Sequence, residues 1–263
     1  MQDLNYQPFD LNADNDAALD VEQVQTAVEQ RGYCDFLFRH AASAKSFKSE
    51  RARCLVCDAV ASRFRRIDEY DYWKCGSCGH IFIDREQSSE FGKDFYNSAK
   101  YKAVAARWPQ EERLHLFKIM MVEIETVLGR KPQSVLDFGA GSEDIAEKRQ
   151  ISSAATFYDP YFFVDEIDQS MRFDAIIATE VLEHLFDPTG VLRELRGYSD
   201  MVFATTLLSD LNFTPEYLMP SGGHVSIFST NSIALAAQAA GFDHEIVHWS
   251  DQSDFYYHRL IAK

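Results

Sequence analysis

Four cysteines in this chain have the spacing of metal ligands. They form two C-x-x-C pairs, Cys54 with Cys57 and Cys75 with Cys78, and seventeen residues lie between the pairs. This pattern is typical of a four-thiolate zinc site. Because four thiolates leave no open position for water, we expect a structural zinc rather than a catalytic one. Iron of the rubredoxin type is the chemical alternative.

A second group of residues is suited to a nucleotide-like ligand. The stretch VLDFGAGSEDIA (135–146) is typical of a strand that contains Asp137, followed by a glycine turn that opens a helix. Asp159 closes the next expected strand, about twenty residues on, where an acid can accept hydrogen bonds from both hydroxyls of a ribose. Each half is a weak signal alone. Together, Asp137, Gly139, Gly141 and Asp159 favour an adenosine-type ligand.

A third group offers acid–base or metal-binding chemistry. In Glu180-Val-Leu-Glu183-His184 the two carboxylates would lie one helical turn apart, with His184 on the same side as Glu180. His224 follows the strand expected at 201–208, at the same rim of the fold. These four side chains could bind a divalent ion such as Mg²⁺. Without a metal, His224 or His184 is the natural general base. The plainer interpretation is a histidine bonded to a backbone carbonyl.

Alternating strand and helix patterns must position these residues. A helix is expected over 111–129, since apolar residues recur at helical spacing until Gly129. Further on we expect strands at 134–138, 154–159, 173–181 and 201–208, helices at 142–150, 187–198 and 230–240, and a closing antiparallel hairpin from 245–250 and 255–263. This order predicts an α/β fold with a doubly wound, mostly parallel sheet. Such sheets bind ligands at the carboxyl ends of their strands.

The same patterns divide the chain into four parts. These are an N-terminal segment (1–51), a zinc ribbon (52–85), an aromatic bridge or lid (86–109) and the α/β domain (110–263). In the first part we expect a loose lead over 1–17, a helix at 21–31 and a short strand at 33–38. Between the cysteine pairs, FRRIDEYDYWKC alternates enough for a hairpin.

Composition narrows the class of partner. The 263 residues carry a net charge of −15, which argues against a nucleic-acid partner, because such binding depends on Lys and Arg neutralising phosphates. No apolar run is long enough to cross a bilayer, and the acidic N-terminal stretch resembles no secretion signal. We therefore expect a cytoplasmic protein with a small-molecule substrate and no membrane partner. The sequence indicates no oligomeric state.

Four segments resemble a known family. VLDFGAGS, YDP, FDAIIATEVLEHLFDP and GGHVSIFSTNSIALAAQAAGF are together similar to the class I S-adenosylmethionine-dependent methyltransferases, and EVLEHLFDP is the most specific of them. The resemblance covers 110–263. Some sugar and natural-product methyltransferases also carry a cysteine module similar to that of residues 52–101. The resemblance implies a Rossmann-like methyltransferase fold, S-adenosylmethionine as cofactor, and an acceptor such as a sugar nucleotide.

The resemblance also implies roles for single residues. Gly139 and Gly141, with Ala140 between them, would let the backbone approach the methionine part of the cofactor, and Asp159 would hold the ribose. Ala178 and Thr179 would line the methionine and sulfonium side. The segment after Asp159 is too short for the usual third strand and helix. Asp165 is therefore our candidate for the acidic contact to adenine.

For the Glu-x-x-Glu-His segment the resemblance leaves two roles open. Certain O-methyltransferases, in ubiquinone synthesis and at small-RNA 3′ ends, are similar in having Glu-x-x-Glu-His and a distal His. That likeness implies a divalent ion at Glu180, Glu183, His184 and His224. In other relatives the Glu-His pair orders a loop without a metal. Of the aromatic residues, Tyr96, Tyr101, Trp108 and Tyr217 could line the acceptor pocket.

Glu143 departs from the family pattern, which places a third glycine there. Pointing inward, its carboxylate would face that of the cofactor and weaken binding. Pointing outward, it would only start the helix beside Asp144, where a negative charge is favourable; we favour this. A degenerate, non-catalytic fold whose zinc ribbon binds a partner protein is the rival hypothesis. The presence of Asp137, both glycines, Asp159 and the EVLEH block together argues against it.

Overall fold

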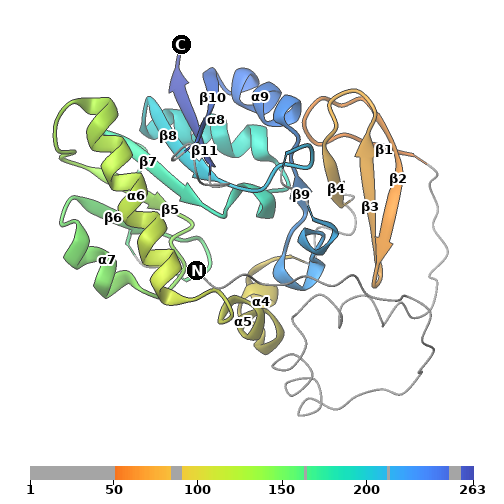
Figure 1. The fold of residues 1–263 in the computed structure, drawn as a ribbon, viewed down its shortest axis with the longest axis horizontal. Coiled ribbons are helices and arrows are strands. Elements are labelled where there is room, and N and C mark those ends of the chain that lie inside the picture. Colours follow the sequence, from red (N-terminus) through yellow and green to blue (C-terminus); the bar gives the residue numbers. More distant parts are fainter. Residues whose placement is uncertain (1–50, 84–90, 163–164, 212–213, 249–255) are drawn as a thin grey trace. The chain divides into compact units, whose positions relative to one another are not determined.

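Two β-sheets organise the described part of the chain. The computed structural model describes residues 51–83, 91–162, 165–211, 214–248 and 256–263 (Figure 1). The loose lead, the helix at 21–31 and the strand at 33–38 lie outside the described residues. The larger sheet has six strands and the smaller has five.

The larger sheet is the expected doubly wound sheet. Its strands are β5 (Val135–Phe138), β6 (Ala155–Tyr158), β7 (Ala175–Thr179), β8 (Met201–Thr205), β10 (Phe242–His248) and β11 (Tyr256–Ala262), in the spatial order β10-β11-β8-β7-β5-β6. The pairs among β5, β6, β7 and β8 are parallel. The closing hairpin is antiparallel, and β11 also pairs antiparallel with β8. The predicted fold class is therefore confirmed.

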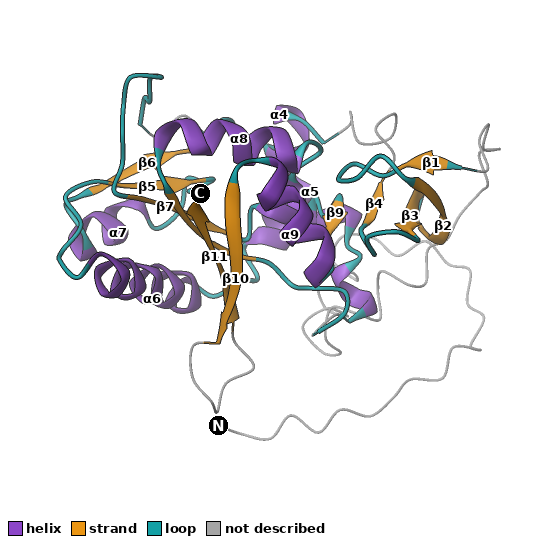
Figure 2. Cartoon of the chain, turned by 90° about the horizontal axis from the view of Figure 1, so that it is seen from above, coloured by secondary structure: helices purple, strands orange, loops and turns teal. Residues whose placement is uncertain are grey.

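Helices cover both faces of this sheet (Figure 2). They are α6 (Gln110–Leu128), α7 (Ile145–Ile151), α8 (Pro188–Tyr198) and α9 (Thr230–Ala239). Along β7 the side chains alternate: Ile176 and Ala178 pack in the core with α8 and α9, whereas Ala175 and Ile177 pack in the core with α6. A parallel strand buried on both faces reads as a continuous apolar run, as this one does.

Two of the expected elements are shorter than predicted, for the same reason. The helix expected from residue 142 begins at Ile145, and the strand expected to reach residue 181 ends at Thr179. Asp144 and Glu180, which stand at these boundaries, have φ values of 64° and 52°. This left-handed conformation interrupts both regular structures, and it is uncommon outside glycine.

The smaller sheet contains the four-cysteine segment. Its strands are β1 (Ala52–Arg53), β2 (Val60–Ile67), β3 (Tyr70–Cys75), β4 (Ile81–Ile83) and β9 (Ser226–Ile227), in that spatial order. The hairpin expected between the cysteine pairs is formed by β2 and β3. The last strand, β9, comes from the α/β part of the chain and pairs with β4 (Figures 1 and 2). The boundary predicted near residue 85 stays a prediction.

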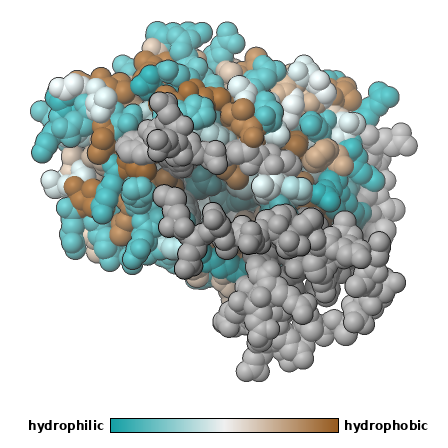
Figure 3. All heavy atoms as spheres, viewed as in Figure 1, coloured by the Kyte–Doolittle hydropathy of each residue, from teal (hydrophilic) through white to brown (hydrophobic). Residues whose placement is uncertain are grey.

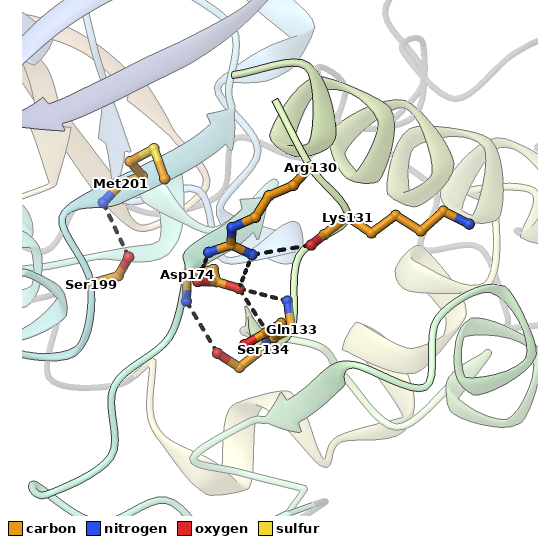
Figure 4. A network of polar contacts seen from close by, with 7 residues as sticks. All are labelled: Arg130, Lys131, Gln133, Ser134, Asp174, Ser199 and Met201. Carbon is orange, nitrogen blue, oxygen red and sulfur yellow. Dashed lines mark hydrogen bonds and ion pairs between the residues drawn. The ribbon is translucent and has the colours of Figure 1, made fainter. Parts of the chain in front are cut away.

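Asp174 fastens the amino ends of two central strands (Figure 4). Its carboxylate accepts hydrogen bonds from the Arg130 guanidinium at 2.7 and 3.1 Å and from the backbone N–H groups of Gln133 and Ser134. The bond from Arg130 is the main cause that lowers the pKa of Asp174 to about 2. This network occupies the amino ends of β5 and β7, so the ligand edge of the sheet lies at the opposite end.

The surface and the helices add two further findings. On the face drawn in Figure 3, hydrophilic residues are spread widely over the described part, with hydrophobic ones between them.

Within the described ranges, none of the helices combines the length and the apolar character that a membrane span requires.

The buried His258, which lies against the partly exposed His244, should make stability depend on pH. His258 is 0% exposed, and burial, followed by repulsion from His244, lowers its pKa to about 3. An unfolded histidine titrates near 6.5, so between these values the unfolded state binds more protons, and stability is lost as pH falls below about 6.5. We expect this residue to cost about 1 kcal/mol at pH 5.5 relative to pH 7.5.

Urea unfolding at the two pH values measures this. His258→Asn should reduce the change in stability between the two pH values by about 1 kcal/mol, while His115→Asn on the exposed face of α6 should leave it as in the wild type. A change in His258→Asn as large as in the wild type would contradict the assignment.

Candidate functional site

The glycine turn after β5 has the backbone of a ligand-binding loop. Gly139 and Gly141 have φ values of 74° and 67°, a region that residues with a side chain rarely adopt. A Cβ at Gly139 would lie 2.5 Å from Cγ2 of Val181, whereas one at Gly141 would meet no atom of the described chain within 4 Å. Gly139 is therefore required by packing. Gly141 leaves open space beside the backbone, which a closely approaching ligand needs.

Asp159 joins this loop to the next strand. Its Oδ2 accepts a hydrogen bond from the Gly141 N–H at 3.1 Å, and its Oδ1 accepts from Tyr161 N at 2.8 Å and Phe162 N at 3.2 Å. A carboxylate has about four lone-pair sites, so it retains capacity for a ribose hydroxyl. The structure brings together the glycine turn and the acid that sequence spacing linked. Their roles as cofactor ligands stay predictions.

Glu143 is held by a cation on α6. The Arg113 guanidinium forms an ion pair with Glu143 at 3.0 Å and with Asp144 at 2.5 Å, and the Glu143 side chain is 58% exposed. The charge that replaces the third glycine is thus partnered and turned toward α6. This geometry supports the outward orientation of Glu143, whose charge Arg113 offsets in part.

Asp137 takes part in a buried ion pair that the sequence did not reveal. Lys148 Nζ on α7 lies 2.7 Å from Asp137 Oδ2, and the two side chains are 12% and 3% exposed. Burial raises the pKa of Asp137, and Lys148 opposes that shift. The ion pair holds α7, the helix that follows the glycine turn, against β5. Lys148 follows the turn by two helical turns, and nothing in its spacing singled it out.

The three other residues predicted to contact the cofactor have different surroundings. Ala178 is 0% exposed within the core, so its side chain faces packed residues, and Thr179 at the end of β7 is partly exposed. Asp165 is already engaged: its carboxylate accepts from Phe157 N at 2.9 Å and pairs with Arg149 at 2.7 Å. Asp165 therefore closes the edge of β6, and its contact to adenine gains no support.

The Glu-x-x-Glu-His segment is not the continuous helical turn that we expected. Only Leu182–His184 form a 3-10 turn, because Glu180 is in the left-handed region, where its N–H donates to the Thr205 hydroxyl at 3.0 Å. The expectation that His184 shares a helix side with Glu180 is therefore wrong. Glu180 and Glu183 still interact: burial and then the charge of Glu183 raise the pKa of Glu180.

Glu183, His184 and His224 come together although forty residues separate the last two. Their ligand-type atoms all lie within 4.8 Å of one another. His184 Nδ1 is 3.0 Å from the Gly223 carbonyl oxygen, and His224 Nδ1 is 2.9 Å from that of Tyr217. A carbonyl can only accept, so each Nδ1 donates and each Nε2 keeps its lone pair. The plainer interpretation, a histidine bonded to a backbone carbonyl, holds for one nitrogen of each ring.

The electrostatics of this cluster keep its histidines neutral. Burial lowers the pKa of His224 to about 3, with repulsion from His184 as a further cause, and burial lowers that of His184. Glu183 is 0% exposed; its Oε1 accepts from the Tyr217 hydroxyl at 2.8 Å, while its Oε2 has no hydrogen-bond partner among the described residues. The site thus offers two imidazole lone pairs and one unpartnered carboxylate oxygen.

Aromatic residues connect this cluster to Asp159. Two short helices, α4 (Lys93–Tyr96) and α5 (Ala99–Ala105), bring Tyr96 and Tyr101 to the ligand edge. The Tyr96 ring stacks on Tyr161 at 4.6 Å, and its hydroxyl lies 3.5 Å from His184 Nδ1. Burial, followed by the charge of Asp159, raises the pKa of Tyr101 to about 12. The lid predicted over 86–109 stays a prediction. The Trp108 carbonyl accepts a bond from Arg113.

The four paired cysteines form one cluster. The sulfur of Cys54 lies 3.6 Å from that of Cys78, and the sulfur of Cys57 lies 3.5 Å from those of Cys75 and Cys78. Tetrahedral zinc with Zn–S bonds of about 2.3 Å separates its sulfurs by roughly 3.8 Å, so the cluster is compatible with zinc. His80 Nδ1 lies 3.7 Å from the Cys54 sulfur, as an outer partner of a thiolate would.

Removing Lys148 should destabilise the fold through Asp137. Lys148→Met leaves the buried carboxylate without its cation, and breaking such a pair costs about 3 kcal/mol in unfolding free energy. Asp137→Asn combined with Lys148→Met should recover most of that loss, because no uncompensated charge remains. A double-mutant cycle in urea measures the coupling; additive effects would show that the ion pair does not hold α7.

Comparison with known proteins accords with this geometry. A family model described as a methyltransferase domain matches residues 113–247, just over half of the chain. No curated protein matches. Similar solved structures include the plantazolicin methyltransferase BpumL in complex with S-adenosylhomocysteine, with 11% identity over 68% of this chain and 99% of that chain and a TM-score of 0.49.

Another similar structure is the Burkholderia thailandensis 1,6-didemethyltoxoflavin-N1-methyltransferase with bound 1,6-didemethyltoxoflavin and S-adenosylhomocysteine. It is 15% identical over 84% of this chain and 100% of that chain, with a TM-score of 0.47. Neither likeness identifies the acceptor of this chain. The match over residues 113–247 covers the glycine turn, Asp159 and the Glu183–His224 cluster. The protein therefore belongs to this methyltransferase-domain family and is an S-adenosylmethionine-dependent methyltransferase.

Proposed function

We propose that the protein methylates a small-molecule acceptor held between Asp159 and the histidine cluster. The observation that carries the proposal is the position of Glu183, His184 and His224, gathered at the ligand edge and linked to Asp159 through stacked Tyr96 and Tyr161. Methyl transfer needs the donor and acceptor atoms aligned and the acceptor deprotonated. A sugar-nucleotide acceptor stays a prediction of the resemblance alone.

The backbone of the glycine turn supports the proposed binding of the cofactor. The open space at Gly141 admits a close approach, and the remaining lone pairs of Asp159 can accept from a ribose. S-Adenosylmethionine supplies the methyl group on a sulfonium when bound. The residues of this chain would orient it: Asp159 at the ribose, and Gly139 and Gly141 beside the methionine part.

Proton transfer from the acceptor is assigned to the two histidines. Each has its Nδ1 held by a backbone carbonyl, which leaves the Nε2 lone pair to take a proton from an acceptor hydroxyl or amine. A second candidate is O-methylation assisted by a divalent ion bound at Glu183, His184 and His224. Two observations favour this alternative. Glu183 Oε2 has no hydrogen-bond partner among the described residues, and both histidines have Nδ1 at a backbone carbonyl, as metal-binding histidines commonly do.

Titration of S-adenosylhomocysteine by calorimetry tests the cofactor site. We expect micromolar binding by the wild type and loss of binding in Asp159→Ala. Gly139→Ala should also lose binding, because its methyl group would overlap Val181 and its φ is positive. Gly197→Ala on α8, where a Cβ meets nothing within 4 Å, is the matched control and should bind as the wild type.

The same titration separates the rival hypotheses. Glu143→Gln should change the dissociation constant less than about threefold, because the carboxylate is largely exposed and paired with Arg113. Absence of binding in the wild type together with binding in Glu143→Gly would mean that the site is switched off. In that case the non-catalytic interaction protein becomes the better hypothesis.

A metal titration distinguishes proton transfer to His184 or His224 from assistance by a bound divalent ion. If the second candidate holds, Mn²⁺ added to zinc-loaded protein binds at one further site per chain, and Glu183→Gln and His224→Ala each weaken it by at least tenfold. His248→Ala on exposed β10 is the control and should leave it unchanged. Saturable binding that survives both variants would place the ion elsewhere; no binding would leave His224 and His184 as the candidate bases.

A further inference from the structure

The four-cysteine ribbon is hydrogen-bonded directly to the loops of the candidate site. Strand β4 pairs antiparallel with β9, with Ile81 opposite Ile227. Next to this pair, the Ile83 N–H donates to the Val225 carbonyl at 2.9 Å. Strand β9, at the edge of the ribbon sheet (Figures 1 and 2), begins two residues after His224, which carries the distal imidazole.

The other edge of this segment binds the Glu-x-x-Glu-His loop. The Val225 N–H donates to the Glu183 carbonyl at 2.8 Å, and the Ser226 hydroxyl donates to the Leu185 carbonyl at 2.7 Å. Residues 225–227 thus lie between β4 on one side and residues 183–185 on the other. Backbone hydrogen bonds run from the ribbon through this segment to Glu183.

Tyr72 adds a side-chain contact at His224 itself. Its ring is 0% exposed in the core that the ribbon shares with Val225 and Ile227, and its hydroxyl donates to the His224 carbonyl at 2.6 Å. The His224 peptide is therefore held from the ribbon side while its Nδ1 is held by the Tyr217 carbonyl. Two independent contacts fix the direction of the imidazole.

The cysteine knuckle is fastened to the same region. The Ser229 hydroxyl, at the N-cap of α9, donates to the Cys78 carbonyl at 2.5 Å, and His80 stacks on Phe228 with ring centroids 5.1 Å apart. A Cβ at Gly79 would lie 2.9 Å from the Ser229 hydroxyl oxygen, so the approach is close. The ribbon contacts both ends of the segment that follows His224.

We infer that the four-cysteine ribbon is a scaffold of the active site, and that Tyr72 is the residue through which it positions His224. The ribbon then acts within the fold rather than as a separate module for a partner protein. The inference rests on the proposed function only in giving His224 a role at the acceptor. The contacts themselves can be tested without any acceptor.

Hydrogen–deuterium exchange of the full-length, zinc-loaded protein tests the scaffold. Tyr72→Phe should speed exchange in peptides covering 218–229 and 180–186 by about tenfold, and leave peptides from β7 and β8 unchanged. Tyr257→Phe, which removes a hydroxyl bonded to Glu123 on α6, is the matched control and should change neither loop. Unchanged exchange at 218–229 in Tyr72→Phe would overturn the inference, and faster exchange everywhere would reduce Tyr72 to a general stability role.

Imidazole ¹H–¹⁵N spectra provide a second readout. In Tyr72→Phe the ring-nitrogen resonances of His224, identified with His224→Gln, should shift, while those of His244 and His258 stay in place. Wild-type ring resonances of His224 in Tyr72→Phe would contradict the positioning role. Failure of S-adenosylhomocysteine to bind would refute the proposed function without altering either measurement, so the two ideas fail separately.

Discussion

The hydrogen bond from the Val225 N–H to the Glu183 carbonyl is the contact on which the candidate site depends. It joins the loop after β7 to the loop after β8, and the bonds from the Ser226 hydroxyl to the Leu185 carbonyl and between His184 Nδ1 and the Gly223 carbonyl reinforce it. Parallel strands alone bring such loops to one edge, but they do not fix the distance between them. Here a strand of the ribbon sheet supplies that constraint, which is why two sheets rather than one define the site.

Charge pairing explains how the glycine loop tolerates so many acids. Asp137, Glu143 and Asp144 lie within eight residues of each other, and each has a cation from a helix: Lys148 from α7 for the first, Arg113 from α6 for the other two. The net charge of the loop region is thereby reduced where an anionic cofactor carboxylate would approach. Positive φ at Asp144 takes over the bend that a third glycine would provide.

Local signals allowed the sequence to predict the fold and part of the site. Apolar periodicity and glycine stops located α6 and the central strands. The segment after Asp159 was expected to be too short for the usual third strand and helix, and among the described residues β7 is the next strand after β6. Lys148, Arg113 and Tyr72 escaped prediction because their partners lie 11, 31 and 152 residues away. The left-handed Glu180 was also missed, because Thr205, whose hydroxyl accepts from its N–H, lies 25 residues away.

Glu183 Oε2 has no hydrogen-bond partner in the part of the chain that the structure describes, and this limits what the site can do. A buried carboxylate oxygen without a hydrogen bond is costly, so a working enzyme must give it a partner. The partner could be a proton, since burial raises the pKa of Glu183. It could be a divalent ion, which would also bind the Nε2 atoms of both histidines. It could be a hydroxyl group of the acceptor, which would donate a hydrogen bond to the oxygen. The first leaves the histidines as bases, the second makes them ligands, and the third makes Glu183 the group that orients the acceptor. These three alternatives differ only in what binds Glu183 Oε2, and the same surrounding residues would serve each of them.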